Sequence, residues 1–317
     1  MKEKMHAFDV GILGTMDATE IAAQIKNKEI SKEEAVKCAI ERAKKVNPTL
    51  NAIVNDCFDA PVVQTEKSEM ACFEGVPTFI KDLIHVKGLP TLHGSLGVST
   101  AAQKKNEKNT QQVLATGCVV LGKSTTSEFG LLPAVETLQQ GITRNPINTA
   151  YSTGGSSGGA GALVAAGVVP FAHAADGGGS IRIPASCCGL VGLKPSRGRD
   201  VESPTAMLNI DIVCQGVLTR TVRDSANYYA AAEAHYANPK LPKIGQVNAP
   251  LKKRLKIALF TGTPTKIKSH SEVNEVTLAA GKFCENLGHQ VELISNPFTQ
   301  ETKIDFLAYW SFVTYLL

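Results

Sequence analysis

The segment DGGGSIRIPASCCGLVG, at residues 176–192, is the most distinctive part of the chain. Three glycines precede Ser180, so the backbone there can approach a bound molecule closely. Its N–H groups can also point at the oxygen of a tetrahedral intermediate, and each such donor typically lowers a barrier by ~2.7–4 kcal/mol. Ser180 is therefore the candidate nucleophile of this segment.

A second glycine-rich segment, GGSSGG at residues 154–159, lies upstream and contains Ser156. The small residues 160–169 between the two segments predict a buried helix that joins two loops in which the backbone itself matters. A serine hydroxyl needs a base, and the chain offers no convincing histidine after residue 180, because His235, His270 and His289 lie among polar residues typical of an exposed surface.

Lys81 is the remaining candidate for the base. It follows VPTFI at residues 76–80, which reads as a buried strand. To act near neutral pH, its pKa must fall from ~10.4 by about three units, and burial at the strand end could cause this. Asp82 would oppose the shift only if the two side chains met, and neighbouring residues of a strand point to opposite faces.

Two other motif matches are set aside. GCVVLGKS at residues 117–124 fits the phosphate-binding pattern, but the four residues between its glycines form an apolar run that predicts a strand. GGSSG at residues 154–158 fits the nucleophile elbow of α/β-hydrolases, yet the preceding residues 145–152 are typical of a turn rather than a strand.

Composition favours an ordinary globular protein. The chain has 317 residues, of which 43% are hydrophobic, and its net charge of +4 is the remainder of 33 basic and 29 acidic residues. Charges this evenly spread argue against nucleic acid as a partner, and the short basic runs at residues 104–108 and 252–254 read as exposed surface. Eight cysteines form no C-x-x-C pair, which indicates reduced, buried thiols.

The N-terminus lacks the apolar stretch of a signal peptide, and the small-residue run at residues 160–175 is interrupted by Gly167, Pro170 and His173. No membrane association is expected, and a cytoplasmic location follows by default. The apolar residues 306–317 are too few to span a bilayer, so they predict a core helix whose remaining neighbours are absent.

Strand and helix signals alternate along the chain, which is typical of the α/β class. Helices are expected after Asp17, from Ser31 to Asn47-Pro48, over residues 109–116 and around Val273 and Val276. Strands are expected at residues 52–54, 76–80, 118–121, 256–260 and 290–293.

Three segments of the chain together resemble the amidase signature family. They are GVPTFIKD at residues 75–82, GSSGG at residues 155–159 and the whole of residues 176–195. The resemblance implies an α/β fold with a mixed central β-sheet flanked by helices on both faces, in one domain that covers residues 1–317 and is truncated at its C-terminus. It implies no metal and no cofactor.

The resemblance also implies the site. Lys81, Ser156 and Ser180 would form a Ser-Ser-Lys triad in which Ser156 follows a cis peptide bond and relays the proton. Gly177, Gly178, Gly179 and Ser180 would supply oxyanion-hole N–H groups, and Ser157, Asp176 and Arg182 would support the loops.

The expected activity is hydrolysis of a small carboxylic amide through an acyl-enzyme. Gly177 stands where Thr or Ile is common, and with Cys187-Cys188 it makes the chain similar to amidases that open the cyclic dimer of 6-aminohexanoate. The amide itself is left open, and a homodimer is one arrangement open to the chain. Two alternatives stay open: the glutamine-hydrolysing component of a tRNA-dependent amidotransferase, which Ile183 disfavours, and an inactive truncated fragment or binding protein.

Overall fold

The computed structural model describes residues 4–64, 71–201, 211–265 and 267–316. It divides into two compact units, Met1–Asn248 and Ala249–Leu317, and each is described by itself. All the candidate site residues lie in the first unit. The expectation of a single domain stays a prediction.

The first two helices begin as their capping sequences predict. Helix α1 (Ala18–Lys26) has Asp17 as its N-cap, and helix α2 (Lys32–Leu50) has Ser31, each with a complete capping box. The predicted end of α2 at Asn47-Pro48 is wrong, because the helix continues to Leu50. A proline so close to the helix end removes one hydrogen bond but keeps a helical φ, so the last turn survives.

Two three-stranded sheets form the centre of the first unit. Strands β1 (Ile53–Asp56), β3 (Val119–Ser124) and β2 (Pro77–Lys81) make a mixed sheet, with β1 antiparallel and β2 parallel to β3. Strands β6 (Phe171–Asp176), β8 (Cys214–Thr219) and β7 (Val191–Gly192) make an antiparallel sheet. The α/β class is therefore confirmed.

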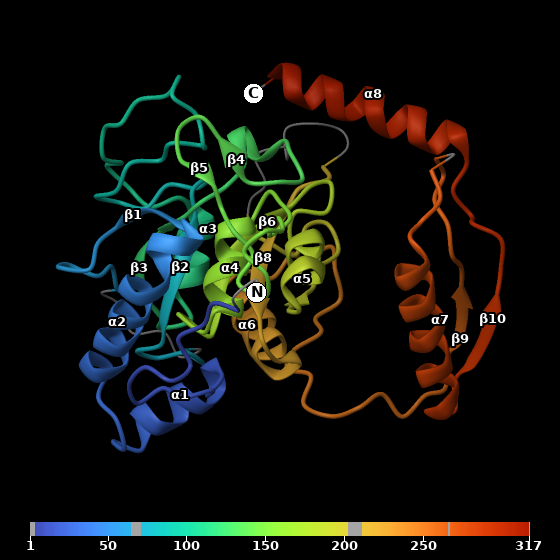
Figure 1. Ribbon diagram of the computed structural model, residues 1–317. Helices are drawn as coiled ribbons and strands as arrows, with labels where there is room; N and C mark the ends of the chain where they lie inside the picture. The colour runs from blue at the N-terminus through green and yellow to red at the C-terminus, as the bar shows by residue number, and fades with distance from the viewer. Residues whose placement is uncertain (1–3, 65–70, 202–210, 266, 317) are drawn as a thin grey trace. The chain divides into compact units, whose positions relative to one another are not determined.

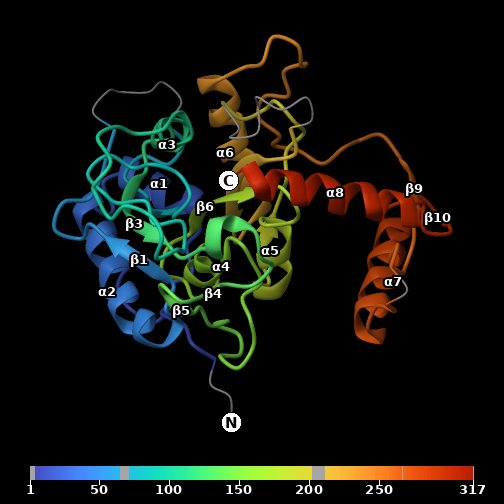
Figure 2. The ribbon, with the colours of Figure 1, turned by 90° about the horizontal axis from the view of Figure 1, so that it is seen from above.

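Helices cover both faces of these strands. Phe79 of β2 and Ala172 of β6 belong to one hydrophobic core together with residues of α2 and α4 (Gly158–Ala165). Their chain neighbours Ile80 and Phe171 belong to a second core with residues of α1, α3 (Lys108–Leu114) and α6 (Val222–His235). Figure 2 shows α4 and α6 on opposite sides of β6. The alternation along the strands thus assigns each side chain to one of two cores.

The other elements of the first unit are short. They are the 3₁₀ turn η1 (Glu128–Gly130), the hairpin strands β4 (Glu136–Thr137) and β5 (Gly141–Ile142), and helix α5 (Arg182–Cys188).

The second unit has a parallel pair of strands, β9 (Lys256–Leu259) and β10 (Gln290–Leu293), joined through helix α7 (Ser271–Asn286) and followed by helix α8 (Gln300–Leu316) (Figure 1). The predicted helix around Val273 and Val276 is confirmed, but these side chains are 58% and 70% exposed. The predicted C-terminal helix is α8, and Leu317 lies outside the described residues. None of the described helices is long and apolar enough to cross a membrane.

Candidate active site

Lys81 lies at the end of β2 with its side chain buried against the first glycine-rich segment. It is 1% exposed, and its Nζ donates a hydrogen bond of 2.6 Å to Ser156 Oγ. Burial lowers the pKa of Lys81 to about 7, and the Asp176 carboxylate opposes this shift. Near neutral pH a large fraction of Lys81 is therefore uncharged and able to accept a proton.

Asp82 takes no part in this contact, because it is held on the other side of the chain by a second buried lysine. Lys123 Nζ lies 3.0 Å from Asp82 Oδ1, and both side chains are at most 1% exposed. Lys123 also donates to Ile84 O and to Thr91 Oγ1. The neighbouring acid is thus already paired, and Lys81 keeps the low pKa of an unpaired buried amine.

The segment that carries Ser156 is closely packed. The Gly155–Ser156 peptide bond is cis, as the resemblance implies. A Cβ built on Gly155 would lie 2.6 Å from Ala134 N and 2.8 Å from Leu132 O, so only glycine fits against that backbone. The glycine before the serine is therefore required by packing and not only by chain flexibility.

A Gly155→Ala substitution is expected to destabilise the protein by about 1–3 kcal/mol, because the new methyl group would overlap main-chain atoms that cannot move aside cheaply. Thermal melting of the variant measures this loss. Gly97→Ala is the matched control: a Cβ there meets only Ser95 Oγ, at 3.6 Å, and melting should be almost unchanged. Equal melting of the two variants would contradict the packing argument.

One hydrogen bond and one packing contact tie the Ser156 segment to the residues on either side of Ser180. Ser157 Oγ donates to Ala175 O at 3.3 Å, just before the second glycine segment. Gly154 lies against Ile183 of α5, just after it, since a Cβ on Gly154 would be 2.8 Å from Ile183 Cγ2. Ser156 and Ser180 are therefore carried by two segments that pack against each other.

Asp176 organises the loop that carries Ser180. Its carboxylate forms a two-point ion pair with Arg182, with bonds of 2.8 and 2.9 Å, and accepts the N–H groups of Gly179 at 2.7 Å and Ile181 at 3.2 Å. Burial alone would raise the pKa of Asp176, but these donors outweigh it and the pKa is lowered. Asp176 thus stays ionised and fixes the backbone around Ser180, which is 8% exposed.

The Asp176 contacts divide the predicted oxyanion donors. The N–H of Gly179 is already used by Asp176. Within the described part of the chain, the N–H groups of Gly178 and Ser180 donate to no protein acceptor. The N–H group of Gly177 likewise donates to no protein acceptor among the described residues, so these three groups are the donors left for a bound ligand.

The phosphate-loop match is confirmed to be a coincidence of letters, since residues 119–124 form the buried strand β3 and Lys123 is 0% exposed and paired with Asp82. Among the later histidines, His235 and His270 are exposed, whereas His289 is half-buried and accepts the N–H of Leu255. All eight cysteines are free, but only four of them are buried: Cys187 is exposed, and Cys57, Cys72 and Cys284 are partly buried. The described ranges contain no group of three or more His, Cys, Asp or Glu side chains that could hold a metal ion.

The sequence reasoning missed one buried polar side chain next to Lys81. His173 of β6 is 0% exposed, and its Nδ1 accepts the main-chain N–H of Lys81 at 3.4 Å. Its position in an apolar strand, FAHAAD, was the available signal, because a histidine in such a strand needs buried partners.

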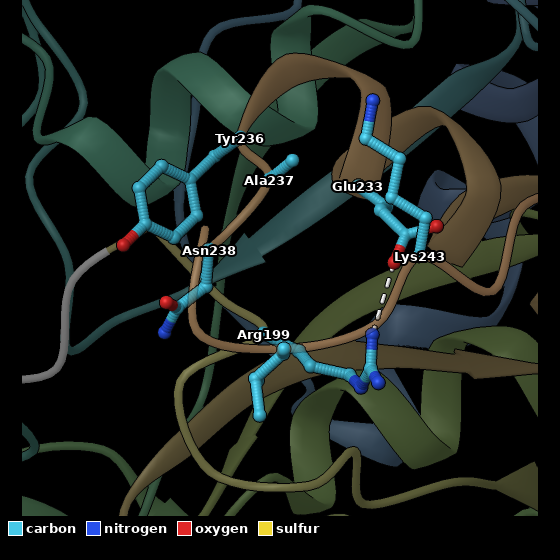
Figure 3. Close-up of a pocket in the computed structure, with 7 residues that line it drawn as sticks. Arg199, Glu233, Tyr236, Ala237, Asn238 and Lys243 are labelled. Carbon is cyan, nitrogen blue, oxygen red and sulfur yellow. Dashed lines mark hydrogen bonds and ion pairs between the residues drawn. The ribbon is translucent and has the colours of Figure 1, made fainter.

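A separate pocket in the first unit does not include any of the predicted catalytic residues (Figure 3). Arg199 Nη1 and Glu233 Oε1 form an ion pair of 2.9 Å beside it. Glu233 also accepts the N–H groups of Ile244 and Gly245. Its carboxylate is therefore satisfied by the protein itself.

The model of the amidase family matches residues 34–315. The chain belongs to the amidase family. One relative is AmiC of Mycobacterium bovis (strain ATCC BAA-935 / AF2122/97), whose name assigns it provisionally to the amidases. It is 46% identical to this chain over 314 residues. That alignment covers 98% of this chain and 66% of AmiC, so the chain spans just under two thirds of this relative.

Solved structures of the family superimpose well. The 6-aminohexanoate cyclic dimer hydrolase is 32% identical with a TM-score of 0.76, over 88% of this chain and 60% of that protein. A bacterial aryl acylamidase of the amidase signature family is 28% identical with a TM-score of 0.74, over 92% of this chain and 63% of its own. The amidase-signature fold expected from the sequence is therefore confirmed.

Proposed function

We propose that this chain carries the catalytic apparatus of an amidohydrolase, which cleaves a carboxylic amide other than a peptide bond. The observation that carries the proposal is the hydrogen bond of 2.6 Å between the buried Lys81 Nζ and Ser156 Oγ. A lysine whose pKa is about 7 can act as a base at neutral pH, and a serine in contact with it can pass on a proton.

In the proposed mechanism, Ser180 Oγ attacks the amide carbon while its proton passes to Ser156 and that of Ser156 passes to neutral Lys81. The N–H groups of Gly178 and Ser180 would stabilise the oxyanion, with Gly177 as a further donor and Gly179 fixed by Asp176. The C–N bond then breaks, and the leaving amine receives the proton from Lys81 through Ser156. The acyl group remains bound to Ser180 as an ester.

Water completes the reaction. It attacks the acyl carbon and gives one proton to Lys81 through Ser156, and that proton returns to Ser180 Oγ as the ester bond breaks. The products are the carboxylic acid and free enzyme. The likeness to a cyclic dimer hydrolase and an aryl acylamidase supports small cyclic or aryl amides as the first substrates to test.

Labelling with a serine-reactive fluorophosphonate tests the nucleophile. Ser180 Oγ would attack phosphorus and expel fluoride, and mass spectrometry should place the adduct on Ser180. Labelling should disappear in Ser180→Ala, and a wild-type adduct on any other serine would overturn the assignment.

Turnover measurements separate the rival functions. Release of aniline from a simple acylanilide supports the hydrolase, whereas release of ammonia from glutamine would favour the amidotransferase component. Cooperative melting by circular dichroism without labelling of Ser180 would favour an inactive or binding protein.

The rate of Ser180 labelling is expected to rise with pH through about 7. Lys81 is the base only when neutral, so below its pKa of about 7 the rate should fall about tenfold per pH unit, and above it the rate should level off. Second-order labelling rates from pH 5 to 9 measure this. A profile that is flat across that range would exclude Lys81 as the base.

A further inference from the structure

His173 lies at the junction of the two central sheets. Strands β2 and β6 pack side by side but do not pair through a backbone ladder in the described structure. Two hydrogen bonds that use side chains cross the junction instead. Thr78 Oγ1 donates to Phe171 O at 2.9 Å, and the main-chain N–H of Lys81 donates to His173 Nδ1 at 3.4 Å.

The partners of the imidazole define its protonation. Nδ1 accepts a main-chain N–H, so it carries no proton, and Nε2 must then carry the proton and donate to Gln215 Oε1 at 3.0 Å. The main chain of Gln215 is fixed, because its main-chain N–H donates to Asp200 Oδ2 at 2.9 Å. Only the neutral ring with its proton on Nε2 satisfies both contacts.

The ring cannot be the base of the reaction. Its two nitrogens face a backbone amide and a side-chain amide, and neither faces a serine hydroxyl. Burial, with the positive charge of Lys81 and of Lys123 added, lowers the pKa of His173 to about 3. The ring also lies on the opposite face of the strands from the Lys81 side chain. Lys81 comes two residues after Phe79, so it shares the face of the first core, whereas His173 comes two residues after Phe171 and shares the face of the second core.

We propose that His173 is a positioning residue for Lys81: its neutral Nδ1 holds the Lys81 backbone at the unpaired junction, and Gln215 holds the ring in the tautomer that can do so. The inference rests on the proposed role of Lys81 as base. With its backbone fixed, Lys81 keeps its amine shielded from water and within hydrogen-bond distance of Ser156. Without the contact, water can enter the junction, and the lysine regains part of its ordinary basicity.

The ionisable groups around Lys81 are few. Strand β6 contributes Asp176 and His173, and β3 contributes Lys123, which is paired with Asp82. Helix α4 contributes no ionisable side chain. A change in the pH profile after substitution of His173 therefore reports on Lys81 and not on a new charge.

Two nearly isosteric variants separate the two nitrogens of the ring. Asn places an acceptor where Nδ1 stands, so His173→Asn can keep the Lys81 contact and lose the Gln215 contact. Gln places its amide where Nε2 stands, so His173→Gln can keep the Gln215 contact and lose the Lys81 contact. Both variants are uncharged.

The experiment is the pH dependence of fluorophosphonate labelling of Ser180 in the wild type, His173→Asn and His173→Gln. The acidic midpoint should stay near the wild-type value in His173→Asn and rise by about one pH unit in His173→Gln, with a rate about tenfold lower at pH 6. A loss of folded protein alone would lower the labelled amount without moving the midpoint. Equal midpoints in all three proteins would overturn the inference.

Gln215→Met provides a second variant in case His173→Gln does not fold. It frees the ring to move its proton to Nδ1, which can no longer accept from Lys81, so the midpoint should again rise; an unchanged midpoint would overturn the inference. If wild-type Ser180 is not labelled at all, the proposed function fails instead, so the two failures are distinguishable.

Discussion

Lys81→Met is expected to slow fluorophosphonate labelling of Ser180 by roughly 10²–10⁴-fold, the usual contribution of a positioned base. Methionine fills a similar volume but cannot accept the proton of Ser156, with which Lys81 Nζ now makes a hydrogen bond of 2.6 Å. Second-order labelling rates at pH 8 measure the effect, because most wild-type Lys81 is neutral there.

The fold should survive this substitution, because an apolar side chain replaces a buried amine that folding must deprotonate. Circular dichroism melting checks this, and the exposed Lys104→Met is the matched control, with wild-type labelling expected. Labelling of Lys81→Met within about threefold of the wild type would remove Lys81 from the mechanism.

Lys123→Met, unlike Lys81→Met, is expected to destabilise the fold, with a loss of about 3–5 kcal/mol in the free energy of unfolding. It leaves the buried Asp82 carboxylate without the ammonium that lies 3.0 Å away. Burial raises the pKa of Asp82 and lowers that of Lys123, and the ion pair opposes both shifts. Denaturant titration of the variant and the wild type measures the loss.

The double variant Asp82→Asn/Lys123→Met isolates the charge. Asparagine can still accept the N–H of Leu92 through Oδ1, but it brings no buried charge, so the double variant should be more stable than Lys123→Met alone by about 1–3 kcal/mol. A Lys123→Met variant within about 1 kcal/mol of the wild type would show that Asp82 finds another partner.

Lys81 and Lys123 show how one residue type acquires two roles in the same sheet. Both lie at the ends of neighbouring strands and are almost completely buried. Lys123 Nζ contacts three oxygen atoms, one of which belongs to a carboxylate, whereas the described contact of Lys81 Nζ is a serine hydroxyl. The difference in partners makes one a structural cation and the other a candidate base.

Much of the fold could be predicted because its signals are local. The capping boxes at Asp17 and Ser31 satisfy N–H groups three residues away, and an apolar run such as residues 118–121 is its own evidence for a strand. The glycine-rich segments around Ser156 and Ser180 could be recognised in the sequence for the same reason. The error at Pro48 concerned a helix end, where one lost hydrogen bond decides little.

The sequence by itself determined which residues could do acyl-transfer chemistry, since Lys81, Ser156 and Ser180 stand in recognisable short segments. Only the tertiary structure decided that Lys81 contacts Ser156, that Lys123 pairs with Asp82, that Asp176 accepts the N–H of Gly179, and that His173 of β6 accepts the main-chain N–H of Lys81. The physical reason is that the pKa of a side chain depends on its desolvation and on its partners. The partners of Lys81 are Ser156 and His173, which lie 75 and 92 positions further along the chain.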